Sequence, residues 1–244
     1  MDIVDIKTDR RAIGPFFHTP DGQQKWRGGI HLPRHKHTEK YVSLILAGGL
    51  EECGSRGRIF AGAGDVLMHG AFDTHLDRIF VSGAEVLNLR LPGLGAIPYG
   101  FGRVRDPDLI AKCAETDLAT AQGLLCEQTV PVYNVPRDWP DLLAADLLED
   151  PNRRLEDWAD AHRLTPETLS RGFSRVFGIA PREFRAQIRA RRAFEQIVEG
   201  TEVLSKVLER SGYYDLAHMS RSVRELTGAA PNSWLNMTSF KRLE

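Results

Sequence analysis

The sequence predicts a two-domain α+β protein, with an N-terminal β-barrel followed by an all-α domain that contains two helix-turn-helix units. Three observations predict it. Short apolar, β-branched runs separated by glycine turns fill residues 1–100, as is typical of a barrel or sandwich. Three prolines fall within residues 129–140, and from about residue 137 no stretch has the pattern of a strand. Finally, one helical unit occurs twice near the C-terminus, at an offset of fifty residues.

The composition is that of a globular chain without a membrane segment. The 244 residues carry a formal net charge of −1, and 42% of them are hydrophobic. The longest apolar run, YVSLILAGGL, is too short to span a bilayer, and the acidic start MDIVDIKTDRR is not a signal peptide. Cys53, Cys113 and Cys126 are odd in number and form no CxxC pair, which indicates reduced thiols. We therefore expect a cytoplasmic protein.

Residues 106–128 begin with Asp-Pro and place apolar residues on one face, which predicts a single amphipathic helix after the barrel. Its apolar face either lies across the barrel or pairs with the same helix of a second chain, and we favour a homodimer. The expected limits are 1–104 for the barrel, 105–136 for the helical dimerisation segment and linker, and 137–244 for the helical domain. Helices are expected near 141–149, 154–162, 166–177, 181–199, 202–210, 216–226 and 231–237.

The first copy of the repeated unit is LSRGFSRVFGIAPREF, residues 169–184. Thr165 can cap its helix, and Pro166 takes the first helical position, where a missing N–H costs nothing. An upstream helix over 154–164 and a tight turn complete a helix-turn-helix layout, whose second helix can enter a major groove. The apolar stripe leaves five side chains outward: Glu167, Thr168, Ser170, Arg171 and Arg175.

The second copy is MSRSVRELTGAAPNSW, residues 219–234, which repeats the Ser-Arg pair and the Gly-x-Ala-Pro ending of the first. A lone helix-turn-helix pattern fits any two-helix corner of a core. Two copies at a fixed offset instead favour two reading helices on one monomer, placed for successive major grooves about 34 Å apart. The exposed side of the second copy offers Ala217, His218, Ser220, Arg221 and Arg224.

Residues 141–235 resemble the DNA-binding domain of the AraC/XylS family of bacterial transcription regulators. The resemblance rests on TLSRGFSRVFGIAPREF, on the basic connecting helix with Arg189 and Ala193, and on SGYYDLAHMSRSVRELTGAAPNSW. It implies that the second helix of each unit reads bases, through Glu167, Ser170 and Arg171 in the first unit and Leu216, Ala217, Ser220 and Arg221 in the second. The second unit departs from the family at Leu208, at Met219 and in the apolar Leu216–Ala217 pair. Because these two apolar side chains cannot make a bidentate contact with a base, we expect most base discrimination from the first unit.

Basic residues are concentrated between 163 and 192, where eight Arg face two Glu, a local net charge of +6. Such a block is either a solvated surface or an electrostatic footprint for phosphates. Arg182 and Arg185 are the candidates for phosphate contact. Helix solubility and an internal ion pair with Glu195 are the alternative roles for Arg189, Arg191 and Arg192.

Two segments of the barrel, residues 31–49 and 61–78, resemble the two motifs of a cupin barrel. The first supplies His-x-His, while the second keeps the motif spacing with Gly70 in place of proline and Phe72 in place of glycine. The glutamate that the motif places after the histidines is replaced by Tyr41 or its neighbour. The resemblance implies a sensor domain, because AraC-type regulators commonly carry a cupin-like module in this position.

Three imidazoles around one ion suit Zn²⁺, Fe²⁺ or a similar divalent transition metal, and His35, His37 and His75 are the candidate ligands. Alternatively, these histidines line an effector pocket without a metal or lie exposed near a loop. The candidate pocket residues are His35, His37, Tyr41, Met68, His75 and Arg90. We expect His31 and His69 at surface or core positions rather than among the ligands.

The sequence therefore indicates a regulator with no chemistry of its own. Double-stranded DNA is its expected partner, an unidentified small molecule or protein is its effector, and RNA polymerase is a further partner if it activates transcription. Two alternatives stay open. One is a cupin metalloenzyme with an accessory DNA-binding tail, although the sequence has no paired-carboxylate or Ser-His-Asp constellation. The other is an effectorless regulator whose barrel serves only to dimerise or to bind a partner protein that controls it.

Overall fold

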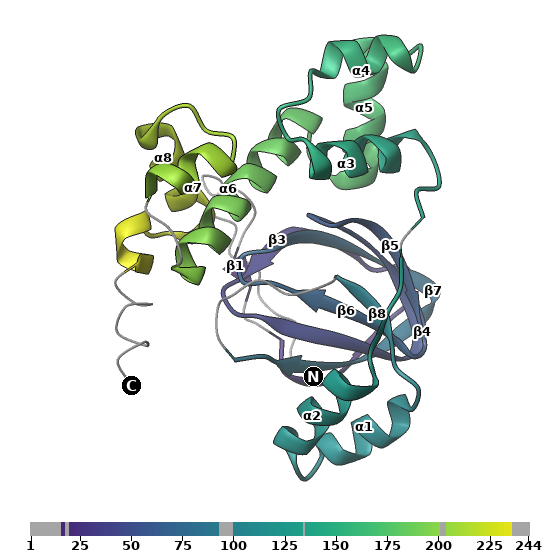
Figure 1. The fold of residues 1–244 in the computed structure, drawn as a ribbon. Coiled ribbons are helices and arrows are strands. Elements are labelled where there is room, and N and C mark those ends of the chain that lie inside the picture. Colours follow the sequence, from purple (N-terminus) through teal and green to yellow (C-terminus); the bar gives the residue numbers. More distant parts are fainter. Residues whose placement is uncertain (1–15, 18–19, 93–99, 134, 201–203, 236–244) are drawn as a thin grey trace.

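The structure, a computed structural model, describes residues 16–17, 20–92, 100–133, 135–200 and 204–235. Its N-terminal half is a strongly curved sheet in the order β1–β3–β7–β4–β6–β8–β9, with β2 beside β7 and β5 beside β4 (Figure 1). The described strand pairs are antiparallel except for the β1–β3 pair. The strands are β1 (Phe16–Phe17), β2 (Gly22–Trp26), β3 (His31–His37), β4 (Tyr41–Gly54), β5 (Gly57–Gly62), β6 (Asp65–His69), β7 (Thr74–Arg90), β8 (Phe101–Arg103) and β9 (Val130–Pro131).

The two longest strands, β4 and β7, pair with each other along most of their lengths. Their register shifts beside Gly48, whose φ is +66°. A Cβ at this position would lie 2.0 Å from the carbonyl oxygen of Gly83 on β7. Only glycine fits such a close approach of two backbones, so the Ala-Gly-Gly stretch marks the bend in β4.

The segment expected to form one helix over 106–128 forms two, α1 (Pro107–Ala114) and α2 (Leu118–Gln128). The side chains of Asp106 and Asp117 each accept a hydrogen bond from the backbone amide three residues later, at 2.9 and 3.0 Å. Each aspartate therefore caps the start of a helix. The single-helix prediction was wrong because apolar periodicity runs through the break at Asp117.

Helices α1 and α2 pack on the barrel, which is the first of the two arrangements considered for their apolar face (Figure 1). Ile110 and Leu125 are fully buried there against apolar side chains of β4, β6 and β7. After α2, β9 pairs with β8, so the segment expected to link the domains also adds a strand to the sheet. The expected domain limits stay predictions.

The C-terminal half is helical, with two helix pairs at opposite ends of a long connecting helix, α6 (Figure 1). Its helices agree closely with the expected ranges: α3 (Trp139–Glu149), α4 (Leu155–Ala161), α5 (Pro166–Phe177), α6 (Pro181–Glu199), α7 (Leu204–Arg210) and α8 (Leu216–Thr227). Residues 231–235 are also helical, whereas 202–203 and 236–237 of the expected helices lie outside the described residues. Among the described helices, none is long and apolar enough to cross a membrane. The expected fold class, a β-barrel followed by a domain with two helix-turn-helix units, is confirmed.

The barrel and the helical domain share buried apolar contacts. Cys53 and Leu76 of the barrel are buried together with apolar residues of α3, α4, α5 and α6. Phe72, in the turn between β6 and β7, contacts Phe194 of α6 and Trp234, with ring centroids 5.0 and 5.6 Å apart. Its φ is +62°, so this turn keeps a glycine-like, left-handed backbone while the phenylalanine side chain reaches the helical domain.

Candidate DNA-binding surface and histidine cluster

The face of α5 carries the reading side chains expected for the first unit. As the sequence predicts, Pro166 begins the helix, and the Thr165 hydroxyl accepts a hydrogen bond from the Thr168 amide at 3.2 Å. Phe173 and Phe177 are fully buried and stack with ring centroids 4.5 Å apart, which fixes the opposite face in the core. All five expected side chains are exposed: Glu167, Thr168, Ser170, Arg171 and Arg175.

The face of α8 has the same organisation. The Asp215 carboxylate caps the helix by accepting a hydrogen bond from the His218 amide at 2.7 Å. Met219 is fully buried and Leu208 is half-buried, so these two of the three departures noted in the second unit are packing residues. Leu216 is 47% exposed, which is high for an apolar side chain of this size. The other expected readers Ala217, His218, Arg221 and Arg224 are exposed, and Ser220 is half-buried.

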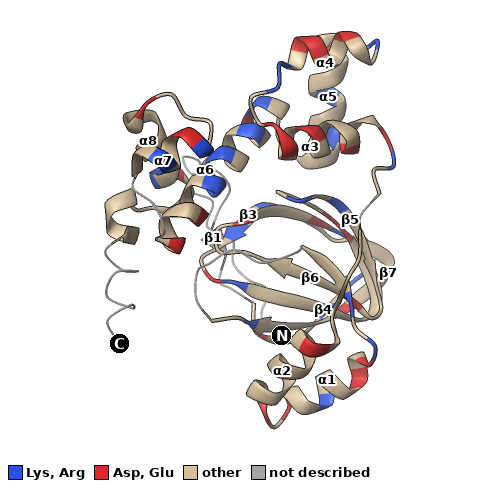
Figure 2. Cartoon of the chain, viewed as in Figure 1, with Lys and Arg blue, Asp and Glu red and all other residues tan. Residues whose placement is uncertain are grey.

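The basic stretch along α6 is visible in Figure 2 beside the acidic segments of α3 and α4. Part of this charge is used inside the protein. Arg191 Nε lies 2.8 Å from Oδ1 of Asp73 in the barrel and 3.0 Å from Oε1 of Glu195, which agrees with the expected internal ion pair. Arg182 is exposed, whereas Arg185 is half-buried and donates to a backbone carbonyl between α3 and α4. The local charge of +6 is therefore only partly available to phosphates.

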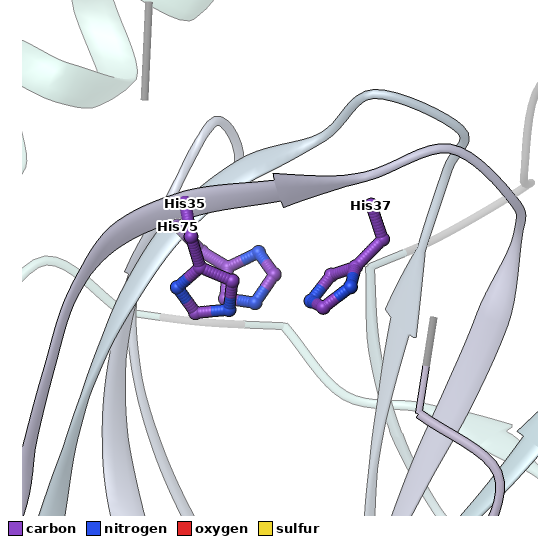
Figure 3. A group of neighbouring side chains, drawn as sticks. All are labelled: His35, His37 and His75. Carbon is purple, nitrogen blue, oxygen red and sulfur yellow. The ribbon is translucent and has the colours of Figure 1, made fainter. Parts of the chain in front are cut away.

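The three histidines proposed as metal ligands do come together inside the barrel. His35 and His37 lie on β3, and His75 stands opposite His35 on β7 (Figure 3). The His35 and His75 ring centroids are 4.3 Å apart, and one nitrogen of each of the three rings lies within 4.8 Å of the others. Tyr41 and His69 complete the cluster: the Tyr41 hydroxyl is 3.3 Å from His75 Nε2, and the His69 and His75 rings are 4.7 Å apart.

Burial keeps His35, His69 and His75 uncharged at neutral pH. It lowers the pKa of His35 to about 4, against a hydrogen bond to the Pro33 carbonyl that raises it, and it holds the pKa values of His69 and His75 well below their usual range. Two carboxyl groups border the rings. Burial raises the pKa of Asp77 to about 7, and burial together with Asp77 raises that of Glu52. Neutral imidazoles beside carboxyl groups are the form that ligates a metal ion.

The cluster fits a small cation. Glu52, Met68, His69 and His75 line a cavity of about 10 Å³, room for one ion or water molecule. His75 Nδ1 is buried and has no hydrogen-bond partner among the described residues, a cost that a metal bond would remove. Glu52, His69 and His75 form a second set of possible ligands, again within 4.8 Å of one another.

The structure brings some of the residues predicted for the effector pocket together and separates others. Tyr41 and Met68 are buried beside the histidines, but Arg90 is not: it is exposed and pairs with Asp21 and Glu39 on the outside of the sheet. Arg90 is the last residue of β7, whereas His75 lies near the start of this strand. Residue type alone does not indicate that the two side chains are so far apart. Glu52, Asp77 and His69 were missed because strand pairing, not motif spacing, brings them to the cluster. His31 is exposed, as expected.

Comparison with known proteins adds to this geometry. Residues 158–237, which include α5 to α8, match the family model described as a helix-turn-helix domain. ToxT from Vibrio cholerae is similar over 89% of this chain and 99% of its own, with 11% identity and a TM-score of 0.41. The C-terminal domain of AraT, a response regulator from Geobacillus stearothermophilus, is similar over 40% of this chain and 84% of its own, with 21% identity and a TM-score of 0.38. A probable AraC family transcriptional regulator from Rhodopseudomonas palustris CGA009 covers 39% of this chain and 93% of its own, with 18% identity and a TM-score of 0.36.

No curated protein matches the chain. The helix-turn-helix model spans both copies of the repeated unit, including α5 and α8. The match supports a DNA-binding transcription regulator.

Proposed function

We propose that this chain is an AraC-type transcription regulator that reads two successive major grooves per monomer, one with α5 and one with α8. The observation that carries the proposal is the repeated geometry. Each helix begins at a side-chain cap, ends at a left-handed glycine (Gly178 or Gly228) and leaves a polar or basic face exposed. The 19 residues of α6 between them span about 28 Å at 1.5 Å per residue, comparable with the ~34 Å repeat of B-DNA.

The two reading faces are suited to unequal roles. Arg171 is exposed on α5 and can make a bidentate contact with guanine, whereas Leu216 and Ala217 on α8 offer only apolar contact with thymine methyl groups. We therefore assign most base discrimination to the first unit. Arg182 and Arg185 are assigned to phosphates, with Arg182 contributing more because it is exposed whereas Arg185 is half-buried.

For the barrel we propose a sensing role centred on the histidine cluster. His35, His37 and His75 would hold a Zn²⁺ or Fe²⁺ ion, with Glu52 and His69 as further donors. The ion would supply a positive charge that ionised Glu52 and Asp77 can balance. The cavity of about 10 Å³ beside Glu52, His69 and His75 has room for an ion but not for an organic effector.

We also propose a homodimer, because paired chains suit operators with repeated half-sites. The inner face of α1 and α2 is used by the barrel, so a second chain would contact the outer face. Leu109 and Leu118 are 42% and 43% exposed on these helices and are available for that contact. RNA polymerase is the further partner proposed for an activator.

Selection of bound duplexes from a random library tests DNA reading by the full chain. We expect two sequence motifs with centres about 10 base pairs apart. Arg171→Ala should cost about 1–3 kcal/mol and relax the sequence preference at one motif, while Arg221→Ala should act at the other. Arg105→Ala removes an exposed arginine outside both units and serves as the matched control. If both α5 and α8 variants weaken every sequence equally, the two arginines contact phosphates and the assignment of base reading is wrong.

A further inference from the structure

We propose that β3 fixes the positions of both proposed reading helices, α5 and α8, and that the histidine cluster controls this positioning. Arg34 holds the C-terminal end of α5, and Lys36 holds the C-terminal end of α8. The inference rests on the proposed function and deepens it, because it assigns the regulation of DNA reading to named contacts between the barrel and the helical domain.

The end of α5 is completed by the barrel. The last four carbonyl groups of an α-helix have no partner within the helix, and here the turn at the C-cap satisfies one of them. The other three accept hydrogen bonds from barrel arginines. Arg78 donates to the carbonyls of Arg175 and Val176 at 2.9 and 2.8 Å, and Arg34 donates to that of Phe177 at 3.1 Å. The barrel therefore supplies every partner that α5 lacks at this end.

The end of α8 is held in the same way. Lys36 Nζ donates to the carbonyls of Glu225 and Leu226 at 3.2 and 2.7 Å. Lys36 is completely buried, which is rare for lysine. A positive charge at this end also complements the helix dipole. The two copies of the repeated unit are thus anchored by two side chains of one strand.

The same strand carries the cluster on its other face. Arg34 and Lys36 of β3 both donate to the helical domain, and Arg34 also donates to Cys53 and Thr74 of the barrel. His35 and His37 point toward His75 inside the barrel (Figure 3). Side chains alternate in this way along any strand, and residues two apart are separated by about 7 Å. The backbone of β3 therefore sets the spacing between the two anchors, and the histidines lie on that same backbone.

The neighbouring segment of the barrel repeats this coupling. His75 is preceded by Thr74, whose hydroxyl and the Arg34 guanidinium both donate to Gln187 Oε1 of α6, at 2.7 and 3.0 Å. The turn that leads to His75 carries Phe72, which contacts Phe194 of α6. Both segments that supply the histidines thus also contact the helical domain. An ion that draws the three imidazoles together would displace the anchors of α5 and α8 together.

The test uses full-length Arg34→Met and Lys36→Met variants, with Lys25→Met, an exposed lysine on β2, as the control. Affinity is measured for a selected two-motif duplex and for duplexes whose motif spacing is changed by one to three base pairs, with and without Zn²⁺. We expect the wild type and the control to prefer one spacing by about tenfold or more and Zn²⁺ to change that preference. In Arg34→Met and Lys36→Met the preference should fall below about threefold and lose its response to Zn²⁺. Lys36→Arg, which keeps a cationic hydrogen-bond donor, should retain most of the wild-type preference for one motif spacing.

Each outcome decides the inference. A spacing preference that stays unchanged in both Met variants, checked for helical content by circular dichroism, overturns the positioning role. Zn²⁺ that has no effect on the wild type, or an equal effect on wild type and variants, overturns control by the cluster. A wild-type chain that selects no duplex at all contradicts the proposed function itself, which separates the two failures.

Discussion

Phe72 gives the sharpest test of the interface between barrel and helical domain, because two effects act on it in opposite directions. Its ring is 3% exposed and contacts Phe194 and Trp234, and truncation of such a phenylalanine to alanine costs about 3–5 kcal/mol. Its φ of +62°, however, costs any non-glycine residue about 1–2 kcal/mol. Alanine keeps this strain, whereas glycine removes it. Phe72→Gly should therefore be about 1–2 kcal/mol less destabilising than Phe72→Ala.

This order reverses the usual one, in which glycine is the more destabilising replacement by about 0.5–1 kcal/mol. The assay is urea unfolding followed by far-UV circular dichroism, with the free energy of unfolding compared among the two variants and the wild type. Val81→Ala, at a side chain that is 94% exposed, is the control and should change the free energy by less than about 0.5 kcal/mol. If Phe72→Gly proves more destabilising than Phe72→Ala, the left-handed turn is not present and the reasoning fails.

Three further predictions concern the repeat, the thiols and the ion. Gly178→Ala and Gly228→Ala both force alanine into a left-handed conformation, but only Gly178→Ala places a methyl group 2.7 Å from Leu76 Cδ2 of the barrel. Gly178→Ala should therefore have the lower midpoint of urea unfolding. Equal midpoints for the two variants would show that the barrel does not contact this helix end. Cys126 is exposed, while Cys53 is buried between the domains and burial raises its pKa. A small thiol reagent should therefore modify Cys126 rapidly and Cys53 only after unfolding, as followed by peptide mass spectrometry. Comparable modification rates at the two cysteines would indicate an open interface between the domains. Elemental analysis should find near-stoichiometric transition metal in the untagged chain and little in a His35→Ala/His37→Ala variant, and metal retained by that variant would exclude these ligands.

The helical domain was predictable because its signals are local. Thr165 and Pro166 mark the start of α5, a glycine marks its end, and the repeat at an offset of fifty supplies the same information twice. The limits of the helices and the exposed reading faces follow from this periodicity. The start of α2 at Asp117 was missed because the same residue type is also common on an exposed helix face.

The site inside the barrel was predictable only where a motif links residues close in sequence. His35, His37 and His75 were found in this way, but Glu52 and Asp77 reach the cluster through the pairing of β4 with β7, a long-range register that short motifs do not encode. The anchoring roles of Arg34 and Lys36 were hidden for the same reason. The helix-end carbonyls that they contact lie more than 140 residues away, and no sequence pattern marks a carbonyl as unsatisfied.

The central claim is that one chain reads two grooves, and guanine N7 methylation interference on a selected duplex tests it most directly. With one chain bound per duplex, confirmed by native mass spectrometry, the account predicts two patches of interference on one face of the DNA, about 10 base pairs apart. Arg171→Ala should remove sensitivity in one patch and Arg221→Ala in the other. A single patch, or two patches that appear only when two chains are bound, would contradict reading by both helices of one monomer.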